Sequence, residues 1–142
     1  MWQLLLEPHS SLAIYSLVGN AWGKRSYSEV VAQCKHSLTF GHIKGDDFVA
    51  LTQIVPIHPG SAWLMVWLAP SVRRSRKSYK LCEELWKSLS ELVFDRLAVN
   101  TLLAVAASKS VAKLARRYGA NETIQVWNYY GAAKDGYFIV WH

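Results

Sequence analysis

The stretch AWLMVWLAPSVRRSRKSYKLCEELW, residues 62–86, joins an apolar run to an amphipathic segment through a basic loop. The run 62–69 predicts a strand that is buried on both faces and ends before Pro70. The segment from Cys82 onward predicts a helix, because its apolar residues recur at helical spacing. Five basic residues occupy the eight positions 73–80, with no acid among them. The stretch therefore predicts a strand–loop–helix unit with a strongly positive loop.

The residues before this unit predict a strand, two helices and a hairpin. The strand covers 2–6, and the first helix covers 9–22 with Ser10 or Ser11 as its N-cap. The second helix covers 26–36, where Ser26 and Glu29 have capping-box spacing. The alternating segments 37–43 and 48–55 flank the turn signal KGDD and predict an antiparallel hairpin.

The residues after the unit predict a strand at 96–106 and a helix at 108–119, with Ser108 as N-cap and Gly119 as stop. A second hairpin follows, formed by 123–130 and 136–142. The expected order is β-α-α-β-β-β-α-β-α-β-β. This order predicts one domain over residues 1–142, of class α+β or α/β, with a mixed sheet and helices on both faces.

The chain has a formal net charge of +6, and nine of its sixteen Lys and Arg lie in the windows 73–80 and 109–117. If the two windows meet, they form one basic surface, which suits a polyanion such as nucleic acid or an acidic protein. The chain also contains seven Trp and seven Tyr. Such an aromatic excess fits both a core and a surface that docks on a protein partner or a second copy.

The sequence favours a soluble protein of a reducing compartment such as the cytoplasm. Cys34 and Cys82 have no metal or redox spacing and are expected to be free thiols. The five histidines are scattered without ligand spacing, so no metal site is predicted. The N-terminal residues lack the pattern of a signal peptide, and no apolar run is long enough to span a membrane.

The order of elements, with strand, proline, basic loop and helix at its centre, resembles the GNAT acyltransferase family. Members carry a loop of form R/Q-x-x-G-x-G/A after the proline, and the matching residues here are Pro70, Arg73, Arg76 and Ser78. A small dipeptide, Gly119–Ala120, stands where the family has Gly–Phe. The resemblance implies a GNAT-like sheet whose central strands 62–69 and 96–103 separate around the pantetheine arm of a coenzyme.

The resemblance also implies a function, N-acylation of an amine by acetyl-CoA or another acyl-CoA. The loop and the helix N-terminus would bind the pyrophosphate, because the first amides of a helix attract anions. Backbone amides at the end of strand 62–69 would polarise the thioester. The implied cofactor-binding residues are Leu68, Ala69, Arg73, Arg74, Ser75, Arg76, Lys77, Ser78 and Ser108.

Several positions depart from the family pattern. Arg76 and Ser78 replace the loop glycines, and Ser108 stands where an Asn is common. The position of the usual acid tyrosine holds Ala115, so no catalytic residue is assigned. Tyr118, three positions further on, is expected to face elsewhere on the helix.

These departures leave three functions open. The protein is an acyl-CoA N-acyltransferase, with full or impaired activity; or it is a degenerate GNAT-fold protein without catalysis that docks through basic and aromatic surfaces. The second alternative resembles small acetyltransferase-like proteins of tailed phages, which would make it a virion or assembly component. The third is nucleic-acid binding through the basic windows.

Overall fold

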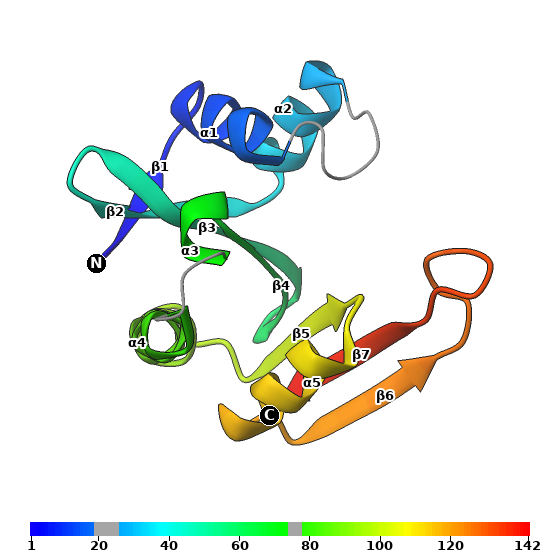
Figure 1. Ribbon diagram of the computed structural model, residues 1–142. Coiled ribbons are helices and arrows are strands. Elements are labelled where there is room, and N and C mark those ends of the chain that lie inside the picture. Colours follow the sequence, from blue (N-terminus) through cyan, green and yellow to red (C-terminus); the bar gives the residue numbers. More distant parts are fainter. Residues whose placement is uncertain (19–25, 74–77) are drawn as a thin grey trace.

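The computed structural model describes residues 1–18, 26–73 and 78–142. Its strands form one sheet in the order β1-β2-β3-β4-β5-β7-β6 (Figure 1). The strands of the described part are β1 (Trp2–Leu5), β2 (Leu38–Lys44), β3 (Asp47–His58), β4 (Ser61–Leu68), β5 (Thr101–Ala106), β6 (Glu122–Val126) and β7 (Gly136–Trp141). The helices are α1 (His9–Val18), α2 (Tyr27–Lys35), α3 (Pro70–Arg73), α4 (Ser78–Ser90), the π-helix η1 (Glu91–Arg96) and α5 (Lys109–Arg117). The predicted order is confirmed, with α3 and η1 as additions.

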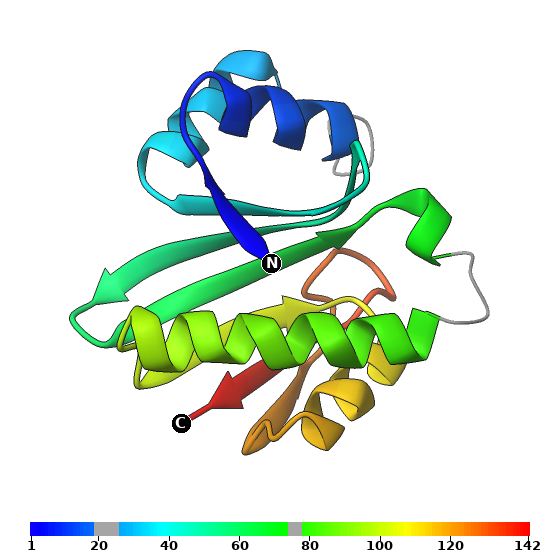
Figure 2. The same cartoon turned by 90° about the vertical axis from the view of Figure 1, so that its left-hand side faces the viewer.

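Helices cover both faces of the sheet, as predicted. On one face α1 and α2 pack on β3 and β4 through a cluster that includes Ile14, Val30, Leu51 and Trp67. On the other face α4, η1 and α5 pack on the central strands around the fully buried Val93 and Leu102. Figure 2 shows α4 and α5 side by side on this second face. The fold class, a mixed α+β sheet layered between helices, is therefore confirmed.

The starts of the first two helices differ in their capping. The prediction that Ser10 or Ser11 caps α1 is wrong, because both lie inside the first turn. The carboxylate of Glu7 performs this role: it accepts hydrogen bonds from the Ser11 backbone N–H at 3.0 Å and from the hydroxyls of Ser10 and Ser11. At α2 the predicted cap is confirmed, since Ser26 Oγ accepts from the Glu29 N–H at 3.3 Å.

The predicted strand 96–106 begins too early, because β5 starts at Thr101. The preceding residues extend the amphipathic helix as η1, which brings Val93 to 0% exposure. The Val99 N–H then bonds to the Val93 carbonyl and closes the connection. The apolar residues 97–99 therefore belong to the connection that follows the helix, although their sequence resembles the start of a strand.

Two further strand predictions need correction. β4 is not buried on both faces, since Val66 is 44% exposed. β6 ends at Val126, and not at 130, because Asn128 adopts a positive φ of 55° and its N–H bonds to Asp135 in the loop. The two hairpins themselves, β2–β3 and β6–β7, are antiparallel as predicted.

Candidate functional site

The centre of the sheet opens between β4 and β5. These strands are parallel neighbours, but their pairing runs only from Ser61–Thr101 to Trp63–Leu103. Beyond this point both strands continue, to Leu68 and Ala106, without pairing with each other. On its other edge β4 stays paired with β3 as far as Leu68. The space left between the separated strands is called the opening below.

The backbone of β4 presents polar groups to the opening. The Ala69 N–H donates to the Val49 carbonyl at 3.0 Å, on the β3 side. Because successive residues of a strand point their amides to opposite edges, Trp67 and Met65 also bond toward β3. The N–H and C=O groups of Val66 and Leu68 therefore face the edge that β5 has left.

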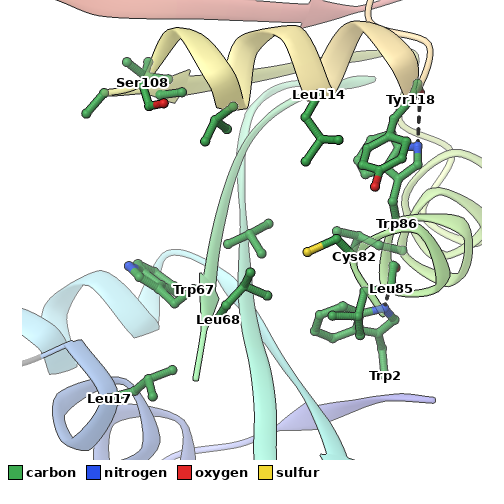
Figure 3. Close-up of a pocket in the computed structure, with 16 residues that line it drawn as sticks. Trp2, Leu17, Trp67, Leu68, Cys82, Leu85, Trp86, Ser108, Leu114 and Tyr118 are labelled. Atoms are coloured by element: carbon green, nitrogen blue, oxygen red, sulfur yellow. Dashed lines mark hydrogen bonds between the residues drawn. The ribbon is translucent and has the colours of Figure 1, made fainter. Parts of the chain in front are cut away.

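Two cavities meet at the opening. The first has a volume of about 560 Å³ and lies between the ends of β4 and β5 and helices α4 and α5. Figure 3 shows Leu114 and Tyr118 reaching from α5 toward Cys82, Leu85 and Trp86 on α4. Leu68 and Ser108 also line this cavity. Most of the other side chains in its wall are apolar.

The second cavity has a volume of about 750 Å³ and extends toward α2 and the β6–β7 hairpin. Its own walls include Gln33, Trp63, Met65, Tyr129 and Tyr130. Val66, Val105, Trp86 and Tyr118 line both cavities. The two spaces are therefore contiguous through the opening, and their volumes fall in the range of small-molecule sites.

Trp63, Tyr129 and Tyr130 line one side of the second cavity, and together with Phe138 they form a group of aromatic rings in edge-to-face contact, called the outer aromatic group. Its ring centroids are separated by 6.2 Å for Trp63–Phe138, 5.2 Å for Tyr129–Phe138 and 4.9 Å for Tyr129–Tyr130. The Tyr129 ring packs so closely over Gly136 that a Cβ there would lie 2.8 Å from the ring. Burial, together with the neighbouring Tyr129, raises the pKa of Tyr130, so its hydroxyl stays protonated at neutral pH.

The opposite wall is the inner aromatic stack, formed by Tyr118, Trp86 and Trp141. Trp86 stacks on Trp141 at 4.8 Å and on Tyr118 at 6.0 Å. The Trp86 Nε1–H donates to the Tyr118 carbonyl at 3.0 Å, the bond drawn in Figure 3. The Trp141 Nε1–H has no hydrogen-bond partner among the described residues, although Trp141 is only 7% exposed.

The position of Tyr118 differs from expectation. The prediction that its side chain faces away from the site is wrong, since it lines both cavities. Tyr118 is the C-cap of α5, and its N–H still bonds to the Leu114 carbonyl at 3.2 Å, so it keeps its helical position. Residues three apart lie on the same face of a helix, which places Tyr118 beside Ala115 at the site. The bond from Trp86 to its carbonyl holds the residue at the opening.

A buried polar network supports the second cavity from behind. Gln33 Nε2 donates to Gln53 Oε1 at 2.5 Å, and Gln53 Nε2 donates to Thr39 Oγ1 at 3.1 Å and Cys34 Sγ at 3.3 Å. Gln53 is 0% exposed. Burial raises the pKa of the Cys34 thiol, which therefore stays neutral in this network. The Gln33 side chain is thus fixed in the cavity wall by bonds to the sheet.

The predicted cofactor-binding residues fall into three groups. Leu68 and Ser108 line the first cavity, and Ser108 also caps α5 through the Ser110 N–H at 3.2 Å. Ala69 is buried, and its N–H is bonded within the sheet. Arg73 ends α3 and Ser78 begins α4, whereas Arg74, Ser75, Arg76 and Lys77 lie outside the described residues. Ala115, at the position of the family's acid, is buried in the wall of the second cavity.

Sequence reasoning missed Gln33, Met65, Tyr129 and Tyr130 as cavity residues. They come from α2, β4 and the β6–β7 connection, which no local pattern brings together. Cys34 and Cys82 are free thiols, as predicted. The described residues contain no cluster of potential metal ligands. Within those same residues, no helix is long and apolar enough to cross a bilayer.

Comparison with known proteins identifies the fold. No protein-family model matches the sequence, and no curated protein matches it either. Among solved structures, the spermidine/spermine N-acetyltransferase SpeG of Vibrio cholerae has a TM-score of 0.76 at 15% identity, over 99% of this chain and 91% of that one. A dodecameric structure of the Vibrio cholerae spermidine N-acetyltransferase gives 0.72 at 15% identity, covering 99% and 92%.

A protein assigned to the GNAT family from Desulfovibrio desulfuricans matches with a TM-score of 0.66 at 15% identity, over 100% of this chain and 98% of that one. The separated central strands and the whole-chain superpositions define the class of architecture. The chain has the fold of the GNAT acetyltransferases, as the sequence resemblance implied.

Proposed function

We propose that the protein is an acyl-CoA-dependent N-acyltransferase built as one domain over residues 1–142. The observation that carries the proposal is the opening between β4 and β5, with a cavity on each side of it. The backbone groups of Val66 and Leu68 have no partner strand on this edge. An amide-containing chain such as pantetheine fits there, because it would hydrogen-bond to this edge of β4 as β5 does around Ala62.

The residues around the opening suit acyl transfer by positioning. Bound acyl-CoA supplies an activated acyl group as a thioester. The N–H of Val66 or Leu68 is placed to donate to the thioester carbonyl and to stabilise negative charge on its oxygen. The acceptor nitrogen forms a bond to the acyl carbon, the carbon–sulfur bond breaks with its electrons moving to sulfur, the nitrogen loses a proton and the sulfur gains one.

Tyr118 is the residue we assign to the sulfur proton. Among the described residues it is the only titratable side chain that lines both cavities. A neutral phenol donates a proton to a developing thiolate without any change of charge before the reaction. Its position three residues after Ala115 compensates for the missing acid of the family pattern.

Calorimetric titration of acetyl-CoA and free coenzyme A tests the proposal. Val66→Trp places a large ring in the opening and is expected to abolish binding, whereas Ile124→Trp, on the exposed surface of β6, is the matched control that retains it. The paired change Arg73→Ala and Arg76→Ala tests the basic loop in the same assay. Absence of binding in folded wild-type protein contradicts the proposal.

A second candidate is a GNAT-fold binding protein without catalysis, such as a virion or assembly component. The observation that favours it is the apolar surface at the β6 edge of the sheet, where Trp127 is 76% and Ile124 53% exposed. Such a surface suits a protein partner or a second copy of the chain. A strictly monomeric protein by light scattering that captures no partner contradicts this candidate.

Nucleic-acid binding would use the basic window of α5, where Lys109, Lys113, Arg116 and Arg117 are exposed. An affinity that does not change with salt concentration excludes it. For the compartment, the free thiols of Cys34 and Cys82 fit reducing conditions such as those of the cytoplasm.

A further inference from the structure

The described residues bring no charged side chain to the wall of the second cavity. None of the described residues in its wall is Asp, Glu, Lys or Arg. For the acids this statement extends to the whole chain, because the two segments outside the described residues read GNAWGKR (19–25) and RSRK (74–77). All ten acids are therefore placed by the structure, and none lines either cavity.

The polar groups that the described residues bring to the second cavity are neutral. They belong to the side chains of Gln33, Tyr118, Tyr129 and Tyr130 and to the indoles of Trp63, Trp86 and Trp141. Trp63, Tyr129 and Tyr130 of the outer aromatic group present aromatic rings to the same cavity. A site of this kind takes a ligand with an apolar, flat body and a small number of hydrogen-bonding atoms.

We propose that the acceptor is a monoamine on an aromatic or similarly apolar body, held against Trp63, Tyr129 and Tyr130, and that polyamines are excluded. This inference rests on the proposed function, and it separates the chain from spermidine acetyltransferases that have the same fold. The amino group would point to the opening, near Val66 and Tyr118, and the ring toward the β6–β7 hairpin.

The physical reason is the cost of an unpaired ammonium group. A polyamine that has lost one proton for the reaction still carries at least one positive charge, which the cavity would hold without a carboxylate. Attraction to the aromatic faces offsets only part of this cost, about 0.5–2 kcal/mol. A monoamine, once deprotonated, is neutral, and apolar surroundings favour that neutral form because they disfavour its charged one. The neutral amine is also the nucleophile.

The first measurement compares phenethylamine with spermidine and putrescine as acceptors of the acetyl group from acetyl-CoA, followed by release of the coenzyme thiol. We expect kcat/KM for phenethylamine to exceed that for spermidine by at least about tenfold. Equal or better use of spermidine overturns the inference while leaving the proposed function intact.

A pair of variants provides the matched test. Met65→Glu places a carboxylate in the wall of the second cavity, next to Gln33 Nε2, which contacts the Met65 sulfur at 3.7 Å. Met65→Gln has nearly the same shape without the charge. We expect Met65→Glu to shift the selectivity ratio toward spermidine by about tenfold and Met65→Gln to leave it unchanged. Equal effects of the two variants contradict a charge-based selectivity.

A binding measurement separates failure of this inference from failure of the proposed function. Phenethylamine and spermidine are titrated separately into wild-type protein without acetyl-CoA, with the fluorescence of the cavity tryptophans as readout. If acetyl-CoA does not bind, or neither amine is acetylated, this titration decides. Saturable binding of phenethylamine that is tighter than that of spermidine supports the inference, and any other result overturns it.

Discussion

The two edges of β4 differ in what they contribute. Toward β3 the strand is paired along its length, from Pro56–Ala62 to Ala50–Leu68, and the face under α1 and α2 is closed by Leu51 and Trp67. Toward β5 it is paired only as far as Trp63. β4 therefore has one edge that is fully paired, toward β3, and one edge that is open, toward β5. Pairing with β3 fixes the strand, so the backbone groups exposed at the open edge are held in place.

The difference also appears in how aromatic and polar groups are used. Behind the β3 edge, Gln53 is fully buried and its amide bonds to Gln33, Thr39 and Cys34. Near the opening, the rings of Tyr129 and Tyr130 are partly exposed and contact each other edge to face. A binding site requires side chains that are held rigidly and surfaces that remain free to contact a ligand. The buried network around Gln53 supplies the first, and the exposed tyrosine rings supply the second.

The largest expected effect is on stability, and it tests whether only the β3 edge is structural. Leu51→Ala removes a side chain that is 1% exposed opposite Trp67, and we expect the free energy of unfolding to fall by about 2–5 kcal/mol. Val66→Ala, at the open edge, is the control and should change it by less than about 0.5 kcal/mol. Urea unfolding followed by circular dichroism measures both. A similar loss in both variants would mean that the edges do not differ.

The next effect is on catalysis at the open edge. Tyr118→Phe removes the hydroxyl and keeps the ring stacked on Trp86 and the carbonyl bond to its Nε1–H. We expect kcat to fall by about 100-fold or more, with the affinity for acetyl-CoA unchanged. Steady-state kinetics and calorimetry measure these quantities. An unchanged kcat would remove Tyr118 from the proton transfer.

The contrast between the two edges of β4 explains which features of the fold could be predicted from the sequence alone. The order of elements, both hairpins and the caps at Ser26 and Ser108 follow from local periodicity and short-range hydrogen bonds, which a single chain segment contains. The opening depends on where two strands stop pairing. That point is set by packing of whole layers, so the apolar run 62–69 was predicted as fully buried although Val66 is exposed.

The candidate site shows the same division. Leu68 and Ser108 could be predicted because they end one element and begin another next to the opening. The direction of Tyr118 also follows from its spacing of three residues from Ala115, because such residues share a helix face. Its stacking on Trp86, which is distant in sequence, could not be predicted. Tyr129 and Tyr130 reach the second cavity only because β6 pairs with β7 and the connection folds back over Gly136.

A smaller effect is expected at α1, which covers the closed side. Although partial burial raises the pKa of Glu7, hydrogen bonds from Ser10 and Ser11 hold it below its ordinary value. A lowered carboxyl pKa stabilises the fold above the unfolded value, about 4.3, and this contribution is lost as the pH falls through the folded value. Glu7→Gln should therefore cost at most about 1 kcal/mol near neutral pH, since water screens the exposed carboxylate.

The measurement for Glu7→Gln is urea unfolding of wild type and variant as a function of pH. The two curves should converge below the titration range of the carboxyl group, where the wild-type Glu7 is protonated. Ser16→Ala, which removes a hydroxyl that donates to the Leu12 carbonyl of the same helix, is the control without pH dependence. Parallel curves for Glu7→Gln and wild type at all pH values would contradict the assignment.

The smallest effect compares the two thiols, one on each side of the contrast. Cys34 lies behind the β3 edge and is 7% exposed, whereas Cys82 is half-buried in the wall of the first cavity. Burial raises the pKa of both thiols, and only the thiolate reacts, so alkylation should be slow at neutral pH and accelerate above about pH 8.5. At any pH in this range Cys82 should react at least about tenfold faster than Cys34, because reagent reaches it through the open cavity.

Coenzyme A should slow alkylation of Cys82 and leave that of Cys34 unchanged, as measured by mass spectrometry of each peptide. Equal protection of both thiols would indicate global stabilisation by the ligand, whereas protection of Cys82 alone locates the ligand at the open edge of β4.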